Sequence, residues 1–262
     1  MTELSALVLA GRRGPDDPLA AAHGASHRAL LPVGGVPMVL RVVRSLLATE
    51  RIAKLHISIE APEHLQAIDE LARLEAKGRL CIHRSLSSPS RSVGAVLALT
   101  EAPFLVTTAD HALLDAAMLD HFLDAMATSD ADILVGLVSK TLLQAAYPET
   151  KRTYLRFRSE AWSGANLFGC RTPDARKAVE FWRRAERHRK QPWRMISMIG
   201  ADLAALYMAG RIDIDDALVR ASKKLGVDVR KVAMPIPEAA IDVDRQSDLE
   251  LASRILAERE AS

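Results

Sequence analysis

The stretch Leu4–Pro15, which reads LSALVLAGRRGP, decides the fold of this chain. Its first seven residues form a short apolar run, which is typical of a strand buried in the middle of a parallel sheet. The run ends at Gly11, where the missing Cβ lets backbone amides approach a ligand closely. Arg12 and Arg13 follow, and their guanidinium groups offer charge-assisted hydrogen bonds to phosphate. We therefore interpret the stretch as a strand that leads into a phosphate-binding loop.

A second stretch, Arg28–Met38, reads RALLPVGGVPM and precedes a helix that begins at a proline. Together the two stretches resemble the nucleotidyltransferases of the nucleotide-diphospho-sugar transferase fold, and within it the molybdenum-cofactor guanylyltransferase-like (MobA-like NTP transferase) branch. The openings of that family read roughly L-A-G-G-x-x-x-R-M and K-x-L-L-x-x-x-G-K-P-M. Two positions differ, because Arg12 replaces the second glycine and Arg28 replaces the lysine. Arginine keeps the positive charge and adds a planar fork, but it is not equivalent to lysine.

The resemblance implies a set of nucleotide-binding residues at the start of the chain. They are the strand end and loop residues Leu9, Ala10, Gly11, Arg12 and Arg13, together with Arg28. Arg13 and Arg28 are expected to act on the phosphates during catalysis.

Composition restricts the function classes. The 262 residues are 49% hydrophobic, which is enough for a sizeable core, and the formal net charge of +2 is too balanced to indicate nucleic-acid binding. The two cysteines, Cys81 and Cys170, indicate two buried thiols in a reducing compartment. We see no signal peptide and no apolar run near the ~20 residues that span a bilayer, so we expect a cytoplasmic protein without stable membrane insertion. A homodimer stays open.

Strand and helix patterns alternate through the first half of the chain, which favours a mostly parallel sheet wound with helices. With the resemblance, this predicts an α/β, Rossmann-like three-layer sandwich. We expect a single domain over residues 1–262, with a nucleotide-binding half at about 1–140 and an acceptor-side half at about 141–262. The expected strands are 4–10, 55–59, 80–83, 104–107, 133–138, 153–157, 166–169, 229–233 and 240–243. The expected helices are 37–47, 62–75, 90–99, 113–127, 173–189, 195–208, 215–225 and 247–260.

A carboxylate follows the expected strand at 104–107, in the segment VTTADHALL. Asp110 would point into the crevice where open α/β sheets bind ligands. Taken alone, the segment is better explained by a helix cap, because aspartate is a favoured cap residue. It also resembles the family's T-x-D-x-P-L-L, with Ala112 in place of proline, and this resemblance implies a catalytic, metal-binding role. His111 is better explained by a surface or helix-start position.

The segment IDVDRQSDL, residues 241–249, resembles the family's closing D-I-D-T-P-E-D-L. The resemblance places the second metal-binding carboxylate at Asp244, while Asp242 could face solvent at a strand end. Magnesium prefers oxygen ligands, often one or two protein carboxylates plus phosphate oxygens. Asp110 with Asp244 therefore predicts a Mg²⁺ site.

Two further segments are candidates for substrate recognition. Ser90, Arg91 and Ser92 open an expected helix and resemble the part of the fold that lies beside the nucleobase, although a plain capping run explains them equally well. On the acceptor side, the segment 163–168 resembles the family's G-G-N-L, which implicates Gly164 and Asn166. Arg152 and Arg156 could grip an acceptor phosphate, or simply mark an exposed strand face. The basic run at 183–190 is more often a solvated helix face.

These features predict a Mg²⁺-dependent nucleotidyltransferase that joins a nucleoside monophosphate, from CTP or GTP by preference, to a phosphorylated small-molecule acceptor and releases pyrophosphate. Two alternatives stay open. The sequence Asp242-Val243-Asp244 could imitate the Asp-x-Asp motif of a glycosyltransferase of the same fold that uses a nucleotide-sugar. Arg12 and Arg28, which depart from the family pattern, could instead mark a non-catalytic nucleotide-binding protein. The acceptor is open: molybdopterin, a cobinamide phosphate, a sugar phosphate and a polyol phosphate all fit.

Overall fold

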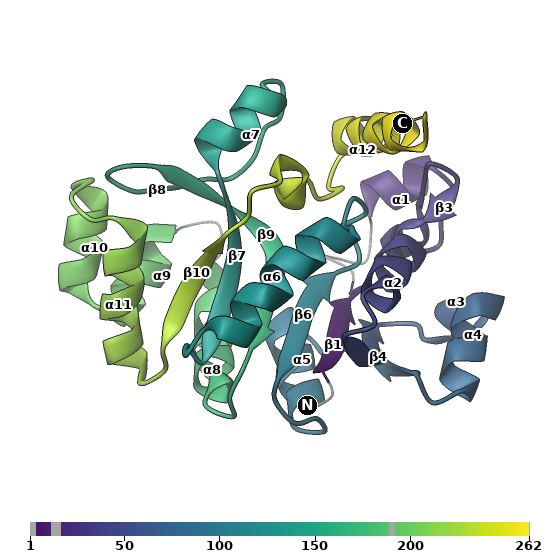
Figure 1. Cartoon of the computed structure of the whole chain (residues 1–262), viewed down its shortest axis with the longest axis horizontal. Helices are drawn as coiled ribbons and strands as arrows, with labels where there is room; N and C mark the ends of the chain where they lie inside the picture. Colours follow the sequence, from purple (N-terminus) through teal and green to yellow (C-terminus); the bar gives the residue numbers. More distant parts are fainter. Residues whose placement is uncertain (1–3, 12–16, 189–191, 262) are drawn as a thin grey trace.

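A twisted eight-stranded sheet forms the centre of the described part of the chain (Figure 1), which in this computed structural model comprises residues 4–11, 17–188 and 192–261. In spatial order its strands are β10 (Val229–Ala233), β7 (Ile133–Ser139), β9 (Ala161–Cys170), β6 (Phe104–Thr108), β1 (Leu4–Leu9), β4 (Ile52–Ile59) and β5 (Leu80–Arg84); β8 (Leu155–Arg156) pairs with β9 outside this order. A small hairpin of β2 (Pro32–Val33) and β3 (Val36–Pro37) lies apart from it.

The sheet is mostly parallel, as the sequence predicts. β1 pairs in parallel with both β4 and β6, and β10 pairs in parallel with β7. β9 runs antiparallel between β6 and β7, and short β8 extends it. β1 therefore lies in the interior of the sheet, which explains why its sequence is apolar on both faces.

Helices cover both faces of the sheet and complete three layers. One face packs against α2 (Met38–Ala48) and α6 (Ala116–Thr128), and the other against α5 (Pro89–Leu97) and α8 (Ala175–Ala185). The alternation of β1 decides which side chain joins which layer. Ala6 and Val8 belong to the core under α2, whereas Leu7 belongs to the core under α5. The predicted three-layer α/β fold is confirmed.

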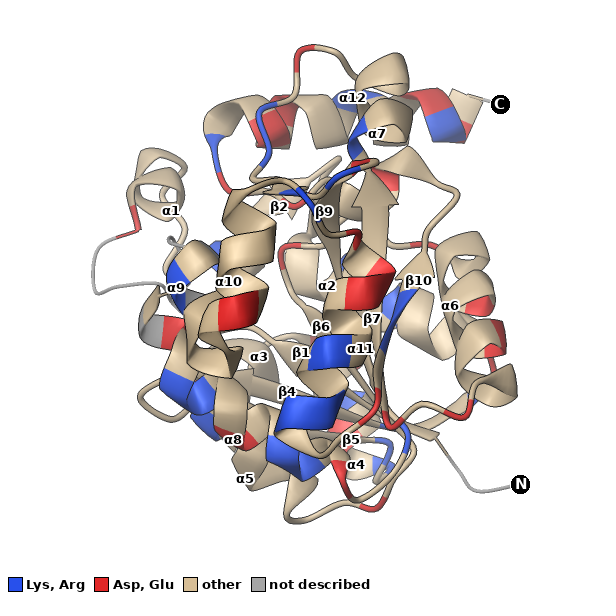
Figure 2. Cartoon of the chain, turned by 90° about the vertical axis from the view of Figure 1, so that its left-hand side faces the viewer, with Lys and Arg blue, Asp and Glu red and all other residues tan. Residues whose placement is uncertain are grey.

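Three helices form a smaller lobe beyond one end of the sheet (Figure 1). They are α9 (Pro192–Ile199), α10 (Ala201–Met208) and α11 (Ile214–Leu225), and they share a small core around Leu203, Ile212 and Ala221. Figure 2 shows acidic residues on α10 and α11 and basic residues on α8 and α11, so this part of the chain carries both signs of charge. The basic run expected at 183–190 falls partly here, with Arg183 and Arg184 exposed on α8, while residues 189 and 190 lie outside the described residues.

Several predicted boundaries are wrong. The helix expected at 195–208 breaks at Gly200 into α9 and α10, and the helix expected at 62–75 is divided into α3 (Glu63–Gln66) and α4 (Asp69–Ala76). The strands expected at 153–157 and 166–169 become the two-residue β8 and the ten-residue β9. Residues 240–243 do not form a strand: Ala240 ends the 3₁₀ turn Pro237–Ala240, and residues 241–243 belong to no ladder.

The described residues contain no helix long and apolar enough to cross a membrane. The expectation of two buried thiols holds for Cys170 alone, since Cys81 is partly exposed. The single-domain organisation stays a prediction.

A pair of histidines lies under α5 on β4 and β5. His56 is 4% exposed, and its Nδ1 lies 2.8 Å from Nε2 of His83. Burial, together with the nearby His83 and Lys54, lowers the pKa of His56 to about 4. The folded protein therefore keeps His56 neutral in a pH range where the unfolded chain protonates it.

We expect this difference to make stability depend on pH. Between pH 6.5 and pH 4.5 the unfolded state binds the proton and the folded state does not, so the free energy of unfolding should fall on acidification. At ~1.4 kcal/mol per pKa unit, His56 accounts for up to about 2–3 kcal/mol. Urea titrations at both pH values should show a smaller loss for His56→Gln than for wild type. The exposed His121, changed to glutamine, is the control, and an equal pH dependence in wild type and His56→Gln would contradict the assignment.

Candidate active site

The carboxyl ends of the central strands meet at one edge of the sheet. Leu9, the last residue of β1, lies beside Ser58 of β4 and Thr108 of β6. Two backbone bonds extend this register: Ala10 N donates to Ser58 O at 2.8 Å, and Ala109 N donates to Leu9 O at 2.9 Å. The start of the expected phosphate loop and the segment that carries Asp110 are therefore held side by side.

Three carboxylates gather at this edge. Asp110, Asp242 and Asp244 each offer a ligand oxygen, and these oxygens lie within 4.8 Å of one another. The backbone places them: Val243 N donates to Asp110 O at 2.9 Å, and Ile241 and Val243 are fully buried. In an extended segment, alternate residues point the same way, so Asp242 and Asp244 both turn away from that buried side. We call these three residues the acidic triad.

The acidic triad contains Asp110 and Asp244, the two carboxylates that the sequence analysis assigns to one metal site, and Asp242 as a third. The expectation that Asp242 faces solvent at a strand end is wrong. Burial, and then the nearby charge of Asp110, raises the pKa of Asp242 to about 6, although Arg152 acts in the opposite direction. Three oxygens this close repel one another when ionised, and a divalent cation relieves that repulsion. The all-oxygen donor set fits Mg²⁺.

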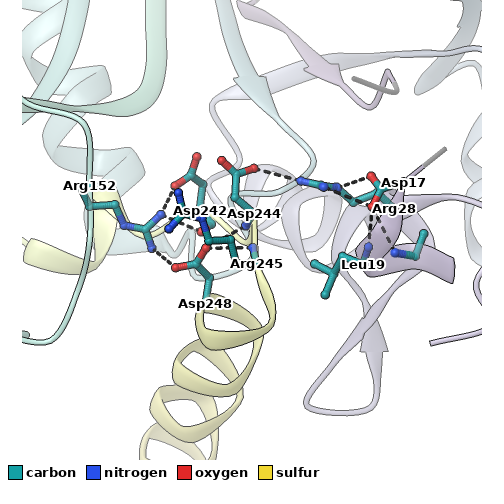
Figure 3. A network of polar contacts seen from close by, with 9 residues as sticks. Asp17, Leu19, Arg28, Arg152, Asp242, Asp244, Arg245 and Asp248 are labelled. Atoms are coloured by element: carbon teal, nitrogen blue, oxygen red, sulfur yellow. Dashed lines mark hydrogen bonds and ion pairs between the residues drawn. The ribbon is translucent and has the colours of Figure 1, made fainter. Parts of the chain in front are cut away.

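Arg28 lies on one side of Asp242 and Asp244, two members of the acidic triad (Figure 3). Its NH1 is 3.0 Å from Asp244 Oδ1, and its Nε and NH2 donate to the carboxylate of Asp17 at 2.5 and 3.2 Å. The residue at the family's lysine position thus lies directly beside a proposed metal ligand. No motif in the sequence points to Asp17.

Arg152 lies on the other side of Asp242 and Asp244 (Figure 3). It is nearly buried, bonds to the carbonyl and carboxylate of Asp242, and donates through NH2 to Asp248 Oδ1 at 2.9 Å. The hypothesis that Arg152 grips an acceptor phosphate therefore does not describe its contacts, since its terminal nitrogens bind protein carboxylates. Arg156, on β8, has an exposed side chain.

Asp248 ties this network to the last helix. Its Oδ2 accepts from the backbone N–H groups of Asp244 and Arg245 at 3.1 and 3.0 Å, just before α12 (Gln246–Ala261). Its Oδ1 accepts from Arg152. One carboxylate therefore fixes both the backbone of the acidic triad and the arginine beside it.

Asn166 occupies a distortion in β9. Its φ is +50°, a left-handed value that asparagine tolerates better than most residues, and the register between β7 and β9 shifts at this point. Residues opposite the shift crowd Gly136, where a Cβ would lie 3.2 Å from Leu167 Cβ. Phe168 pairs with Val106 in the antiparallel ladder, so Asn166 lies further along β9 in the direction of the carboxyl end of β6. Gly164 is exposed on the same strand.

The expected base-recognition segment begins α5. Ser90 and Ser92 are buried, Arg91 is exposed, and Ser92 Oγ accepts from Leu86 N at 2.9 Å, so this hydroxyl shapes the preceding loop. Beside it a cavity of about 320 Å³ opens between β4, β5 and α5. It is lined by Ser58, Ile82, His83, Arg84, Leu86, Ser92, Ala95, Val96 and Leu99.

Other predicted residues divide into three groups. Leu9, Ala10 and Gly11 lie at the end of β1. A Cβ at Gly11 would lie 3.3 Å from Glu60 Oε1, so the side chain of Glu60 leaves little room for a larger residue at position 11. Arg12 and Arg13 lie outside the described residues. His111 is 1% exposed, which contradicts a surface role; burial lowers its pKa to about 4.

The comparisons with known proteins agree with the fold. The family profile described as "MobA-like NTP transferase domain" matches residues 6–165. A hypothetical transferase from Thermus thermophilus is 29% identical, with a TM-score of 0.77 over 95% of this chain and 100% of its own. A CMP-2-keto-3-deoxy-manno-octonic acid synthetase, solved with CTP, is 14% identical, with a TM-score of 0.59 over 98% and 100%.

A 4-diphosphocytidyl-2C-methyl-D-erythritol synthase from Anaerococcus prevotii is 11% identical, with a TM-score of 0.56 over 97% of this chain and 96% of its own. At such low identity, this synthase and the CMP-forming enzyme show a shared fold alone. No curated protein sequence matches this chain.

The acidic triad leads to a prediction for Asp242→Asn. Because the pKa of Asp242 is raised in the folded state, ionising it at pH 8 costs stability, and asparagine removes that cost. Without metal at pH 8 the variant should be more stable than wild type by about 1–3 kcal/mol, with a smaller difference near pH 4. Mg²⁺ should raise the melting temperature of wild type more than that of the variant. Thermal melts with and without Mg²⁺ test both points, and an equal Mg²⁺ response would remove Asp242 from the metal site.

Proposed function

The chain belongs to the MobA-like NTP transferase family and is a nucleotidyltransferase, and from this premise we propose a specific reaction. The protein transfers a nucleoside monophosphate from a nucleoside triphosphate, with CTP or GTP favoured, to a phosphorylated small-molecule acceptor. Pyrophosphate is released, and Mg²⁺ is the cofactor. The observation that carries the proposal is the acidic triad at the carboxyl ends of β1 and β6, within reach of Arg28.

In this proposal Asp110, Asp242 and Asp244 hold the magnesium ion. Bound there, Mg²⁺ would offset negative charge on the phosphates. Arg28 donates to a phosphate oxygen from its place beside Asp244, and Arg13 is the second proposed phosphate contact. Gly11 leaves room for backbone amides to approach the polyphosphate.

The chemical step is an in-line displacement. An oxygen of the acceptor phosphate forms a bond to the α-phosphorus while the bond from that phosphorus to the bridging oxygen breaks. Pyrophosphate leaves with the electron pair. Because an ionised phosphate is already nucleophilic, the site needs no side chain to remove a proton. The residues contribute by positioning the reactants and by stabilising the charge of the transition state.

Recognition of the two substrates is proposed for two separate segments of the chain. Ser90, Arg91 and Ser92, with the cavity beside them, are proposed to receive the nucleobase. Asn166, Gly164 and Arg156 are proposed to contact the acceptor. Asn166 supports this because its side chain has no hydrogen-bond partner among the described residues, and its amide can donate and accept. We place the reaction in the cytoplasm, as expected from the two free thiols.

One observation favours a second function. Asp242 and Asp244 both belong to the acidic triad, as an Asp-x-Asp pair of a glycosyltransferase would. Membership of an NTP transferase family favours nucleotidyl transfer instead. Incubation with nucleotide-sugars distinguishes the two, because only a glycosyltransferase would release a nucleoside diphosphate.

The direct test is pyrophosphate release. Each of the four triphosphates, offered with a panel of phosphorylated acceptors and Mg²⁺, should yield one productive combination. Asp110→Asn should reduce that turnover at least a hundredfold, about 3 kcal/mol, while the fold remains intact by circular dichroism. Full activity of Asp110→Asn at ordinary Mg²⁺ would contradict the proposal. Triphosphate binding without pyrophosphate release from any combination would favour a non-catalytic binding protein.

A second test concerns the acceptor. Asn166→Gly keeps the left-handed backbone available and removes only the amide, whereas Asn166→Ala removes the amide and adds backbone strain of about 1 kcal/mol. Both variants should raise the KM for the acceptor, and only the alanine variant should lower the melting temperature. Triphosphate affinity, measured by calorimetric titration, should stay unchanged. An unchanged acceptor KM in Asn166→Gly would leave Asn166 with a purely structural role.

A further inference from the structure

Arg28 departs from the family pattern in a way that the structure makes specific. A guanidinium group has two usable edges, whereas an ammonium group is a single point of charge. Asp17 takes one edge, through Nε and NH2, and the remaining nitrogen, NH1, lies 3.0 Å from Asp244. The orientation of Arg28 toward the acidic triad is thus defined by Asp17.

Asp17 is itself held firmly. Its Oδ1 accepts from the backbone N–H groups of Leu19 and Ala20, both at 3.1 Å, and so caps α1 (Pro18–Ala22). Leu19 and Ala20 are buried, which fixes the short helix to the core, and the side chain of Asp17 is 9% exposed. Burial alone would raise the pKa of Asp17, but the hydrogen bonds from Arg28 and Ala20 lower it below its ordinary value. The carboxylate is therefore ionised and rigid at neutral pH.

We propose that Asp17 is a positioning residue for the triphosphate, acting through Arg28. By binding the Nε edge, Asp17 fixes the plane of the guanidinium group and directs NH1 to the rim of the acidic triad, where phosphate oxygens of a metal-bound triphosphate would lie. Asp17 and Arg28 together perform the task of the family's single lysine. The inference rests on the proposed function and adds a residue that it does not include.

A lysine at position 28 would behave differently beside Asp17. Its single ammonium group would pair with the nearest rigid carboxylate, which is Asp17, and would be drawn away from the acidic triad. Removing the charge of Asp17 would free such a lysine to reach the phosphates. The two positions should therefore be coupled, so that the effects of changing them are not additive.

The experiment is a double-mutant cycle with Asp17→Asn, Arg28→Lys and the double variant. Asparagine is an equally good helix cap and nearly the same shape, so it removes the charge without removing the cap. The readouts are the Kd of the preferred triphosphate with Mg²⁺, by calorimetric titration, and the melting temperature. Asp17→Ser, which also caps, checks that any loss does not come from the asparagine amide facing Arg28.

We expect Asp17→Asn and Asp17→Ser each to weaken triphosphate binding about tenfold, with melting temperatures close to that of wild type. Arg28→Lys should weaken binding about ten- to hundredfold in the wild-type background and clearly less in the Asp17→Asn background. Asp115→Asn is the matched control. Asp115 also caps a helix, accepting from Met118 N at 2.9 Å, and also pairs with an arginine, Arg259, at 3.1 Å. Triphosphate affinity should not change in this variant.

The outcomes separate the two hypotheses. If Asp17→Asn binds triphosphate and turns over like wild type, this inference is overturned and the proposed function stands. Additive effects in the cycle would overturn the coupling, and with it the positioning role. A loss of affinity that follows a fall in melting temperature would assign Asp17 to helix capping alone. If wild type bound no triphosphate, the proposed function and this inference would both fall.

Discussion

The mutual repulsion of three carboxylates is the constraint around which this edge of the sheet is organised. Asp110, Asp242 and Asp244 place their oxygens within 4.8 Å of one another, and positive charge close by reduces the cost of holding them there. Arg28 and Arg152 supply it from opposite sides (Figure 3). Arg28 and Asp244 are 216 residues apart in sequence, so this charge balance joins the beginning and the end of the chain.

The same balance suits a site that handles a metal and a polyphosphate together. A divalent cation would bind the carboxylates of the acidic triad. The phosphates would bind positively charged side chains, which in this structure pair with those carboxylates. Binding both partners would let Arg28 exchange a carboxylate for a phosphate while Asp244 exchanges an arginine for the metal. Arg152 differs, because it is nearly buried and its other partner, Asp248, also fixes the backbone of Asp244 and Arg245. We therefore interpret Arg152 as part of the scaffold of the acidic triad.

Much of the fold follows from local sequence, since strands such as β1 and β6 are short apolar runs whose pattern is decided by neighbouring residues. The wrong predictions have a common physical origin, because they depend on contacts between residues that are distant in sequence. Residues 240–243 look like a strand because Ile241 and Val243 are apolar, but both are buried by the core without joining a ladder. The partners of Arg152 lie 90 and 96 residues away, and the sequence around Arg152 does not predict them. The metal-binding role of Asp110 and Asp244 is indicated by the resemblance of their segments to a family.

The antiparallel strand β9 explains how the second half of the chain reaches the same edge. In a purely parallel sheet every strand would bring its carboxyl end to the acidic triad, whereas β9 runs the other way and offers its middle, at Asn166. Burial alternates along this part of β9: Ala165 and Leu167 are buried, and Asn166 is partly exposed between them. Asn166 keeps this place although its φ is +50° and the register between β7 and β9 shifts here. Gly136 of β7 lies opposite the shift, and a Cβ there would crowd Ala165 and Leu167. A position that looks ordinary in the apolar sequence of β7 thus leaves room for the distorted segment that presents the polar side chain of β9.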